Sequence, residues 1–331
     1  MSRRSKRIFA TLAGSLMAMA GWSQTGPEGL GHLSLRTVSP GHLLRPNVGY
    51  PCIEQLGPRQ WLLRSALTLG NVWLHRKDAY VVDGEWLVAD FVVSYGLTDQ
   101  SRVSVGLPII RRGGGFGDVA IETFHNTLGI GNAHREDHPR NRMRMDVLGP
   151  EGRRKVIAGD AWGVGDVPVF LSLRLREPGE HMPVVYVQVG CTLPTGRAEE
   201  LFGLGRPLWG ASVIGFQPLG SSPWRVYGGG SVSYAPLRQW TDIELRREEI
   251  AGLLGLQYMV SSRMAWMVQY LATSPVARDY YTFADWTHEL AVGFQRWITD
   301  EIAFEFAFVE NIFRFTNSAD VSIHAALTWR L

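Results

Sequence analysis

The sequence is poor in cysteine and has no long hydrophobic run after its first twenty residues. Cys52 and Cys191 are its only cysteines among 331 residues, too few for a disulfide scaffold, and we expect them to be apart and unpaired. No stretch of 18 apolar residues is present, so no transmembrane helix is available. The formal net charge of +2 argues against a nucleic-acid-binding protein.

The first twenty residues have the three parts of a secretory signal. A positive start (Arg3, Arg4, Lys6 and Arg7) precedes an apolar run over 8–20 that ends in Ala-Met-Ala. This run is too short to span a bilayer, and the order of the parts is that of a signal peptide. We therefore expect residues 1–20 to be removed and the chain to be exported.

Glycine and tryptophan are abundant in the sequence, and apolar and polar residues alternate with a period of two in many segments. The stretch 301–308 reads EIAFEFAF, with Phe304, Phe306 and Phe308 on one parity and Glu305 on the other. Such alternation predicts strands with one apolar and one polar face. It recurs clearly or with noise near 60–70, 86–95, 102–110, 167–176, 184–193, 208–218, 224–235, 250–260, 264–273, 287–298, 301–312 and 320–331.

The connections between these strands alternate in length. Short turns such as GLTDQ and GSS alternate with longer connections at 71–85, 111–165, 194–207, 236–249, 274–286 and 313–319. Short turns on one rim and long loops on the other are typical of outer-membrane barrels. Since unpaired backbone groups are costly in lipid, strands cross it only as a closed barrel. The alternative is a soluble β-sandwich, with the Phe row packed on a second sheet.

The sequence therefore predicts an all-β, single-chain antiparallel transmembrane β-barrel of about twelve strands over residues 59–331, in the cell outer membrane. Four aromatic residues near strand ends fit an interfacial girdle: Tyr95, Tyr258, Tyr270 and Trp329. The terminal Leu327-x-Trp329-x-Leu331 pattern resembles the signal read by the barrel-assembly machinery. We expect a monomer that contacts membrane lipid and lipopolysaccharide.

The loop over 111–165 is unlike ordinary barrel sequence. It contains the series Gly114, Gly115, Phe116, Asp118, Phe124, His125, Leu128, Gly129, Arg135, Pro139 and Arg140. With YGLTDQSRVSVGLP before it, and GVGD and LPTG after it, the series resembles a family of Gram-negative outer-membrane barrels that carries a domain-of-unknown-function label. The resemblance implies location and fold, and it supplies no reaction.

Within this loop the pattern predicts a short helix, about 118–128. Asp118 can cap its start and Gly129 follows its end, and Val119, Ala120, Phe124 and Leu128 form an apolar stripe. The helix can lie over or inside the barrel mouth, or pack the loop onto the rim. Residues that can act as a lid are Asp118, Glu122, Phe124, His125, Arg135, Arg140 and Arg142.

Basic residues dominate the second part of the loop. Residues 134–155 hold seven Arg or Lys against four Asp or Glu. They can contact lipopolysaccharide phosphates, or they can form an ordinary solvated loop.

Three constellations suggest chemistry, and we interpret none of them as a site. Asp320, Ser322 and His324 share one strand parity, which makes them polar lumen lining rather than a hydrolase triad. His134 and His138 have a metal-ligand spacing, but Pro139 follows and no third ligand is evident. The run GGGFG lacks a phosphate-loop ending. We expect no catalytic residue, metal or cofactor.

The lumen-facing parity carries charges of both signs. The candidates are Asp90, Arg174, Arg176, Glu289, Glu305 and His324. The arginines can face Glu289 and Glu305 across a channel and set its selectivity, or form salt bridges and close it. The Pro/Gly-rich segment 21–58 can plug the lumen or remain periplasmic, and its composition favours a disordered tail.

These features together predict a non-enzymatic channel, transporter or receptor for a small molecule, with the 111–165 loop as lid or constriction. The alternatives are an outer-membrane enzyme acting on lipid or lipopolysaccharide, and a structural or adhesive barrel.

Overall fold

The computed structural model describes residues 31–44, 49, 56–129, 131–132, 134–176, 182–313 and 317–331. The predicted signal peptide and Cys52 lie outside these ranges, and Cys191 is a free cysteine. Among the described residues, no helix is both long enough and apolar enough to cross a membrane.

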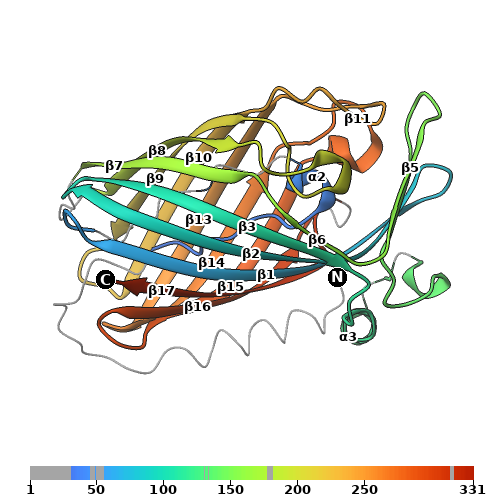
Figure 1. Ribbon diagram of the computed structural model, residues 1–331. Coiled ribbons are helices and arrows are strands. Elements are labelled where there is room, and N and C mark those ends of the chain that lie inside the picture. Colours follow the sequence, from blue (N-terminus) through green and yellow to red (C-terminus); the bar gives the residue numbers. More distant parts are fainter. Residues whose placement is uncertain are drawn as a thin grey trace.

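Twelve antiparallel strands form a closed barrel (Figure 1). They are β1 (Trp61–Arg76), β2 (Tyr80–Thr98), β3 (Ser101–Gly113), β7 (Val167–Arg176), β8 (Val184–Leu193), β9 (Leu208–Pro218), β10 (Trp224–Tyr234), β13 (Glu248–Ser261), β14 (Met264–Thr273), β15 (Thr287–Trp297), β16 (Ile302–Asn311) and β17 (Val321–Arg330). The barrel closes where β1 pairs with β17, from Leu62↔Arg330 to Asn71↔Val321. The predicted fold class is confirmed, and the sandwich alternative is wrong.

Side chains alternate across the barrel wall as predicted. Glu305 is 5% exposed and lies inside, whereas Phe308, on the opposite parity, is 36% exposed. Aromatic pairs lie on the outer surface near strand ends, with Trp61 4.6 Å from Tyr95 and Trp224 4.8 Å from Tyr258 between ring centroids. The apolar outer face and the polar inner face are the arrangement that a lipid-embedded barrel requires.

The two ends of the barrel differ. We call the end with the turns 99–100, 219–223, 262–263 and 298–301 the short-turn rim, and the opposite end the long-loop rim. The C-terminus lies at the short-turn rim (Figure 1). One predicted long loop, 71–85, is wrong: β1 and β2 continue through it and pair as far as Arg76↔Tyr80.

The β1–β2 extension at the long-loop rim is widened by strands from the 111–165 segment. Strand β4 (Arg144–Leu148) pairs with β2, β5 (Arg154–Ala158) pairs with β4, and β6 (Ala161–Val164) pairs with β3. The β4–β5 hairpin projects away from the barrel (Figure 1). Further elements at this rim are η2 (Ala198–Glu200), β11 (Gln239–Trp240), β12 (Ile243–Glu244) and η3 (Tyr281–Ala284).

The loop helix is present but faces differently from the prediction. Helix α3 (Asp118–Leu128) ends at Gly129, which has a left-handed φ of 71°, as predicted. Its N-cap is Gly117, so the cap assigned to Asp118 is wrong. Asp118, Ile121, Glu122 and His125 are buried, whereas Val119 is 52% exposed and Ala120 is exposed. The predicted apolar stripe is therefore wrong at Val119 and Ala120, because paired polar groups take the inner face.

Candidate functional site in the barrel lumen

Residues 31–44, called here the lumen segment, lie inside the barrel and end in helix α2 (Pro40–Leu43) near the long-loop rim (Figure 1). The Leu33 N–H donates to Gln269 Oε1 (3.0 Å), and Gln269 Nε2 donates back to the Leu33 carbonyl (3.0 Å). Tyr227 also donates to Gln269 Oε1 (3.1 Å). For these residues the expected disordered tail is wrong, because the barrel wall supplies hydrogen-bond partners and Leu33 is fully buried.

Glu305 is the centre of a buried network that also binds the lumen segment. Its Oε1 lies 3.0 Å from Arg64 and 3.0 Å from His324 Nε2. The same oxygen accepts from the Ser34 N–H (3.2 Å), and Gln295 donates both to Glu305 and to the His32 carbonyl. A charge removed from water is stable only when it is paired and hydrogen-bonded. The network therefore satisfies the wall charges and fixes the segment.

Two further contacts involve side chains of the lumen segment. Arg36 forms an ion pair with Asp90 (3.4 Å), and Thr37 Oγ1 donates to Glu289 Oε2 (2.6 Å). Four of the six lumen candidates, Asp90, Glu289, Glu305 and His324, thus lie around the segment or in the network that holds it.

The two candidate arginines lie elsewhere. Arg174 is 7% exposed near the short-turn rim and donates to the Asp99 carbonyl (3.3 Å). Arg176 is exposed, because a register shift between Arg174 and Arg176 breaks the strand alternation. The acids contact other residues: Glu305 contacts Arg64 and His324, and Glu289 contacts Thr37. A role of the two arginines in selectivity stays a prediction.

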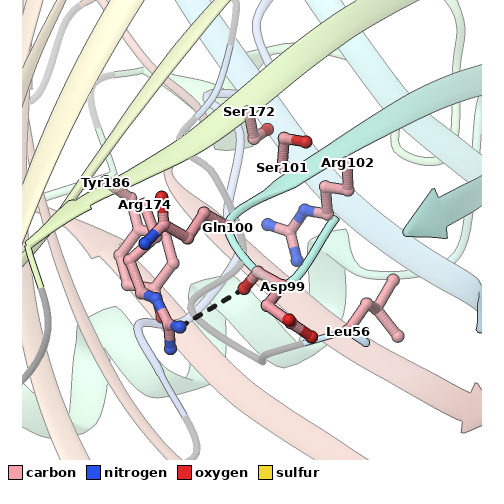
Figure 2. Close-up of a pocket in the computed structure, with 8 residues that line it drawn as sticks. All are labelled: Leu56, Asp99, Gln100, Ser101, Arg102, Ser172, Arg174 and Tyr186. Atoms are coloured by element: carbon pink, nitrogen blue, oxygen red, sulfur yellow. Dashed lines mark hydrogen bonds between the residues drawn. The ribbon is translucent and has the colours of Figure 1, made fainter. Parts of the chain in front are cut away.

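A small pocket lies at the short-turn rim of the lumen (Figure 2). Its walls include Arg102 and Arg174, both 7% exposed, together with Ser172 and Tyr186. Figure 2 shows the Arg174 guanidinium reaching the Asp99 backbone across the β2–β3 turn. Sequence reasoning missed Arg102 and Arg64, although both lie on the inward parity of their strands. That parity was the signal that could have found them.

Apolar residues fill the long-loop end of the lumen. Val38, Leu43 and Leu44 of the lumen segment belong to one buried cluster with residues of the β1–β2 extension, β4 and η3. Members from those elements include Val72, Leu74, Val82, Trp86, Met145, Val147 and Phe283. The lumen segment therefore has a polar part inside the barrel and an apolar part that seals this end.

The loop candidates cluster on the outer side of the rim. Asn71 and Glu85 share the outward parity of β1 and β2, and both are buried by the loop. Arg135 donates to Asn71 (2.9 Å) and Asp118 (3.1 Å) and is also paired with Asp320. Glu85 accepts from the N–H groups of residues 116 and 117 (3.0 and 2.6 Å). The sequence left two positions open for the helix, in or over the barrel mouth or on the rim. In the structure the helix lies on the rim.

The remaining loop candidates also make local contacts. Glu122 pairs with Arg140 (2.6 Å), while His125 contacts Asn132 (3.2 Å), and burial lowers the pKa of His125. Arg142 is exposed, and only the backbone of Phe124 is described. The loop charges thus stabilise the loop itself, and its contact with lipopolysaccharide stays a prediction.

The basic residues further along the loop are partly neutralised. Arg144 and Arg154 both bind Asp146 (2.6 and 2.7 Å) and, with Arg154 foremost, lower the pKa of Asp146 to about 2. Lys155 contacts Glu199 (2.8 Å).

The constellations considered for chemistry are dispersed. Asp320 contacts Arg135, whereas His324 contacts Glu305 and the Thr68 hydroxyl (2.8 Å). In the part of the chain that the structure describes, no group of three or more His, Cys, Asp or Glu is arranged to hold a metal ion.

Solved outer-membrane barrels are similar to this chain. The COG4313 outer membrane channel from Pseudomonas putida F1 has a TM-score of 0.56 and 13% identity, over 83% of this chain and 97% of that one. The NanC porin has a TM-score of 0.45 and 10% identity (82% and 100% covered), and the Pseudomonas putida toluene transporter TodX has 0.36 and 9% (91% and 96% covered). At these identities the likeness concerns the fold alone.

A comparison with curated proteins finds no match. The family model described as "Protein of unknown function (DUF3187)" matches residues 30–331. This bears out the resemblance to a barrel family with a domain-of-unknown-function label, while the loop series as its signature stays a prediction. The chain belongs to the DUF3187 family.

Proposed function

We propose that the protein is a gated, non-enzymatic channel of the outer membrane for a small molecule, closed by its own lumen segment. The observation that carries this proposal is the set of hydrogen bonds between residues 32–37 and inward side chains of β2, β14, β15 and β16. A twelve-stranded barrel is wider than the eight-stranded barrels that side chains fill, and narrower than the open sixteen-stranded porins. Such a barrel has room for a chain segment that closes it.

The chemistry of the wall favours a reversible closure. Gln269, Gln295 and Glu305 bind backbone groups of the segment. When the segment leaves, water can hydrate the same polar groups, because water replaces a direct hydrogen bond at little cost. The apolar side chains Leu33, Val38, Leu43 and Leu44 lie in buried clusters, and their contacts favour the closed state. The wall is therefore suited to a closed and an open state.

The contacts favour movement of the lumen segment over movement of α3. Helix α3 is bound on the outer side of the rim through Arg135, whose guanidinium is buried between two carboxylates. The 111–165 loop contributes to the closure through Met145 and Val147, which pack near α2. The lid role predicted for this loop is thus proposed for β4 rather than for α3.

Planar-bilayer recordings test this proposal. We expect the intact protein to be closed for most of the time, and a variant lacking residues 31–44 to conduct continuously. Glu305→Gln weakens the bonds to Arg64 and Ser34, so it should open more often than the parent. Glu301→Gln is the matched control, because Glu301 precedes the same strand and is exposed.

A folded deletion variant that conducts no better than the parent would contradict the proposal. Folding is checked by migration on a denaturing gel before and after boiling. The alternative of an enzyme gains no support from His324, whose partners are Glu305, Thr68 and Arg64.

A further inference from the structure

An apolar cavity lies beside α2 at the long-loop end of the lumen. The lumen segment forms one wall with Pro40, Gly41 and Leu44. Residues of β4, of the β11–β12 hairpin and of the 274–286 connection form the others, and they include Met145, Ile243 and Val276.

The polar atoms among the lining residues are turned away from the cavity or already satisfied. Tyr280 donates its hydroxyl to the Leu148 carbonyl (2.8 Å), and Trp240 Nε1 donates to the Ala198 carbonyl (3.2 Å). A water molecule needs two to four polar partners to remain in a buried site. The lining is therefore suited to an apolar group and not to a water molecule.

The free space is small, and this determines what a ligand must do. The cavity holds about 30 Å³, so an aromatic ring fits only if one wall moves. Helix α2 is the wall best able to move: it has four residues and no side-chain cap bond to its backbone. Leu43 of α2 and Leu44, which follows the helix, are held in an apolar cluster. An apolar ligand competes for that same surface.

We propose that this cavity is the binding site of a small uncharged apolar molecule, an aromatic ring or short alkyl chain, which displaces α2 and so releases the lumen segment. The release step rests on the proposed gating function, whereas the site itself does not. A ligand shifts such an equilibrium only by its difference in affinity for the two states. Here that difference arises because the ligand fits only after α2 has moved.

Binding is tested with fluorobenzene, followed by fluorine NMR on the full chain in detergent. We expect saturable binding to the parent protein and none of 4-fluorobenzoate, since its carboxylate would be buried without a partner. Ala277→Leu fills the cavity and should weaken binding by about tenfold or more, whereas Ile243→Ala enlarges it and should strengthen binding about threefold or more. The matched control is Ala325→Leu, an outward position on β17, which should bind like the parent.

Equal binding by the parent and both cavity variants would overturn the site. The two cavity variants change affinity in opposite directions, so a folding defect in one leaves the other as a test. Saturable binding of 4-fluorobenzoate as tight as that of fluorobenzene would also overturn the assigned ligand class.

Single-channel recordings test the release step separately. Fluorobenzene should raise the open probability of the parent about tenfold and leave the variant lacking residues 31–44 unchanged. If that variant does not conduct, the proposed gating fails while the binding result stands. If it conducts and fluorobenzene fails to open the parent, the release step is wrong.

Discussion

Inside the barrel, acidic side chains contact partners that are distant in the sequence. Arg64 and Glu305 are separated by 241 positions, and Thr37 and Glu289 by 252. Breaking a buried pair by removing one partner is expensive, because the other charge is left uncompensated. Glu289 and Glu305 are thus both structural groups of the wall and hydrogen-bond partners of the segment.

Strand parity predicts which side chains point inward, but it does not predict their partners. Asp90, Glu289, Glu305 and His324 could be read from alternation alone. Arg176 could not, since a register shift moves it out of phase. The partner of Glu305 depends on which strands are neighbours in the closed barrel, and a single sequence does not contain that information.

The burial of His125 makes the loop helix sensitive to pH. Because burial lowers the pKa of His125 below its ordinary value of 6.5, the folded state binds this proton less readily than the unfolded state does. The stabilisation is complete above about pH 6.5 and is lost as the pH falls through the lowered value. We therefore expect hydrogen-exchange protection of residues 118–128 to fall between pH 7.5 and 5.

His125→Gln should remove this pH dependence. His134→Gln should retain it, because the side chain of His134 is 75% exposed. Protection factors that are the same at both pH values in the parent protein would contradict the assignment.

Helix α3 illustrates how contacts between distant elements override an amphipathic pattern. Its buried face carries Asp118, Glu122 and His125, because Arg135 and Arg140 and the amide of Asn132 supply partners from further along the loop. The sequence predicted the bounds of the helix well, since Gly129 marks its end. It did not predict which face is buried, because hydrophobicity alone predicts burial of Val119 rather than of a carboxylate that has an ion-pair partner.

Arg135→Met should release the loop helix from the rim. The change leaves Asp118 and Asp320 without their common cation, and removing one partner of a buried pair costs about 3–5 kcal/mol. Limited proteolysis should then cut within 114–141, while the barrel keeps its heat-modifiable migration.

The matched change is Arg140→Met. The side chain of Arg140 is 53% exposed, and pairs of this kind contribute about 0–1 kcal/mol. Equal proteolytic resistance of the two variants would show that Arg135 does not hold the loop.

The strands could be predicted where the barrel wall separates lipid from the lumen, and less well in the extension beyond the membrane. Within lipid, alternation is strict because one face meets hydrocarbon and the other the lumen. In the β1–β2 extension, Trp73 and Glu85 are buried on the outward parity and Val72 and Val82 on the inward parity. With both faces covered, the alternation weakens, and 71–85 resembled a loop. The lumen segment has no regular period that could have placed it.

On the outer surface of the barrel, the free-energy cost of introducing a charged side chain should depend on its depth in the bilayer. Val292 lies at the middle of β15 on the outward parity and is 49% exposed. Val292→Arg should cost about 2–4 kcal/mol in urea unfolding from lipid vesicles, the range for arginine at a bilayer midplane.

Ile298→Arg is the comparison, because Ile298 is 56% exposed in the turn that follows the same strand. Near the interface the cost falls to about 0–1 kcal/mol. Equal costs at the two positions would mean that β15 does not cross hydrocarbon.

The seam between β1 and β17 also constrains the order of assembly. The sheet becomes continuous only when the last residues of the chain reach the first strand, where Trp61 and Leu331 exchange backbone hydrogen bonds. The lumen segment precedes β1, yet most of its wall contacts come from β14, β15 and β16, which are made late. The segment therefore lacks these wall partners until β14, β15 and β16 have joined the sheet. It is then either enclosed when β1 and β17 pair, or it enters the barrel afterwards through an open end.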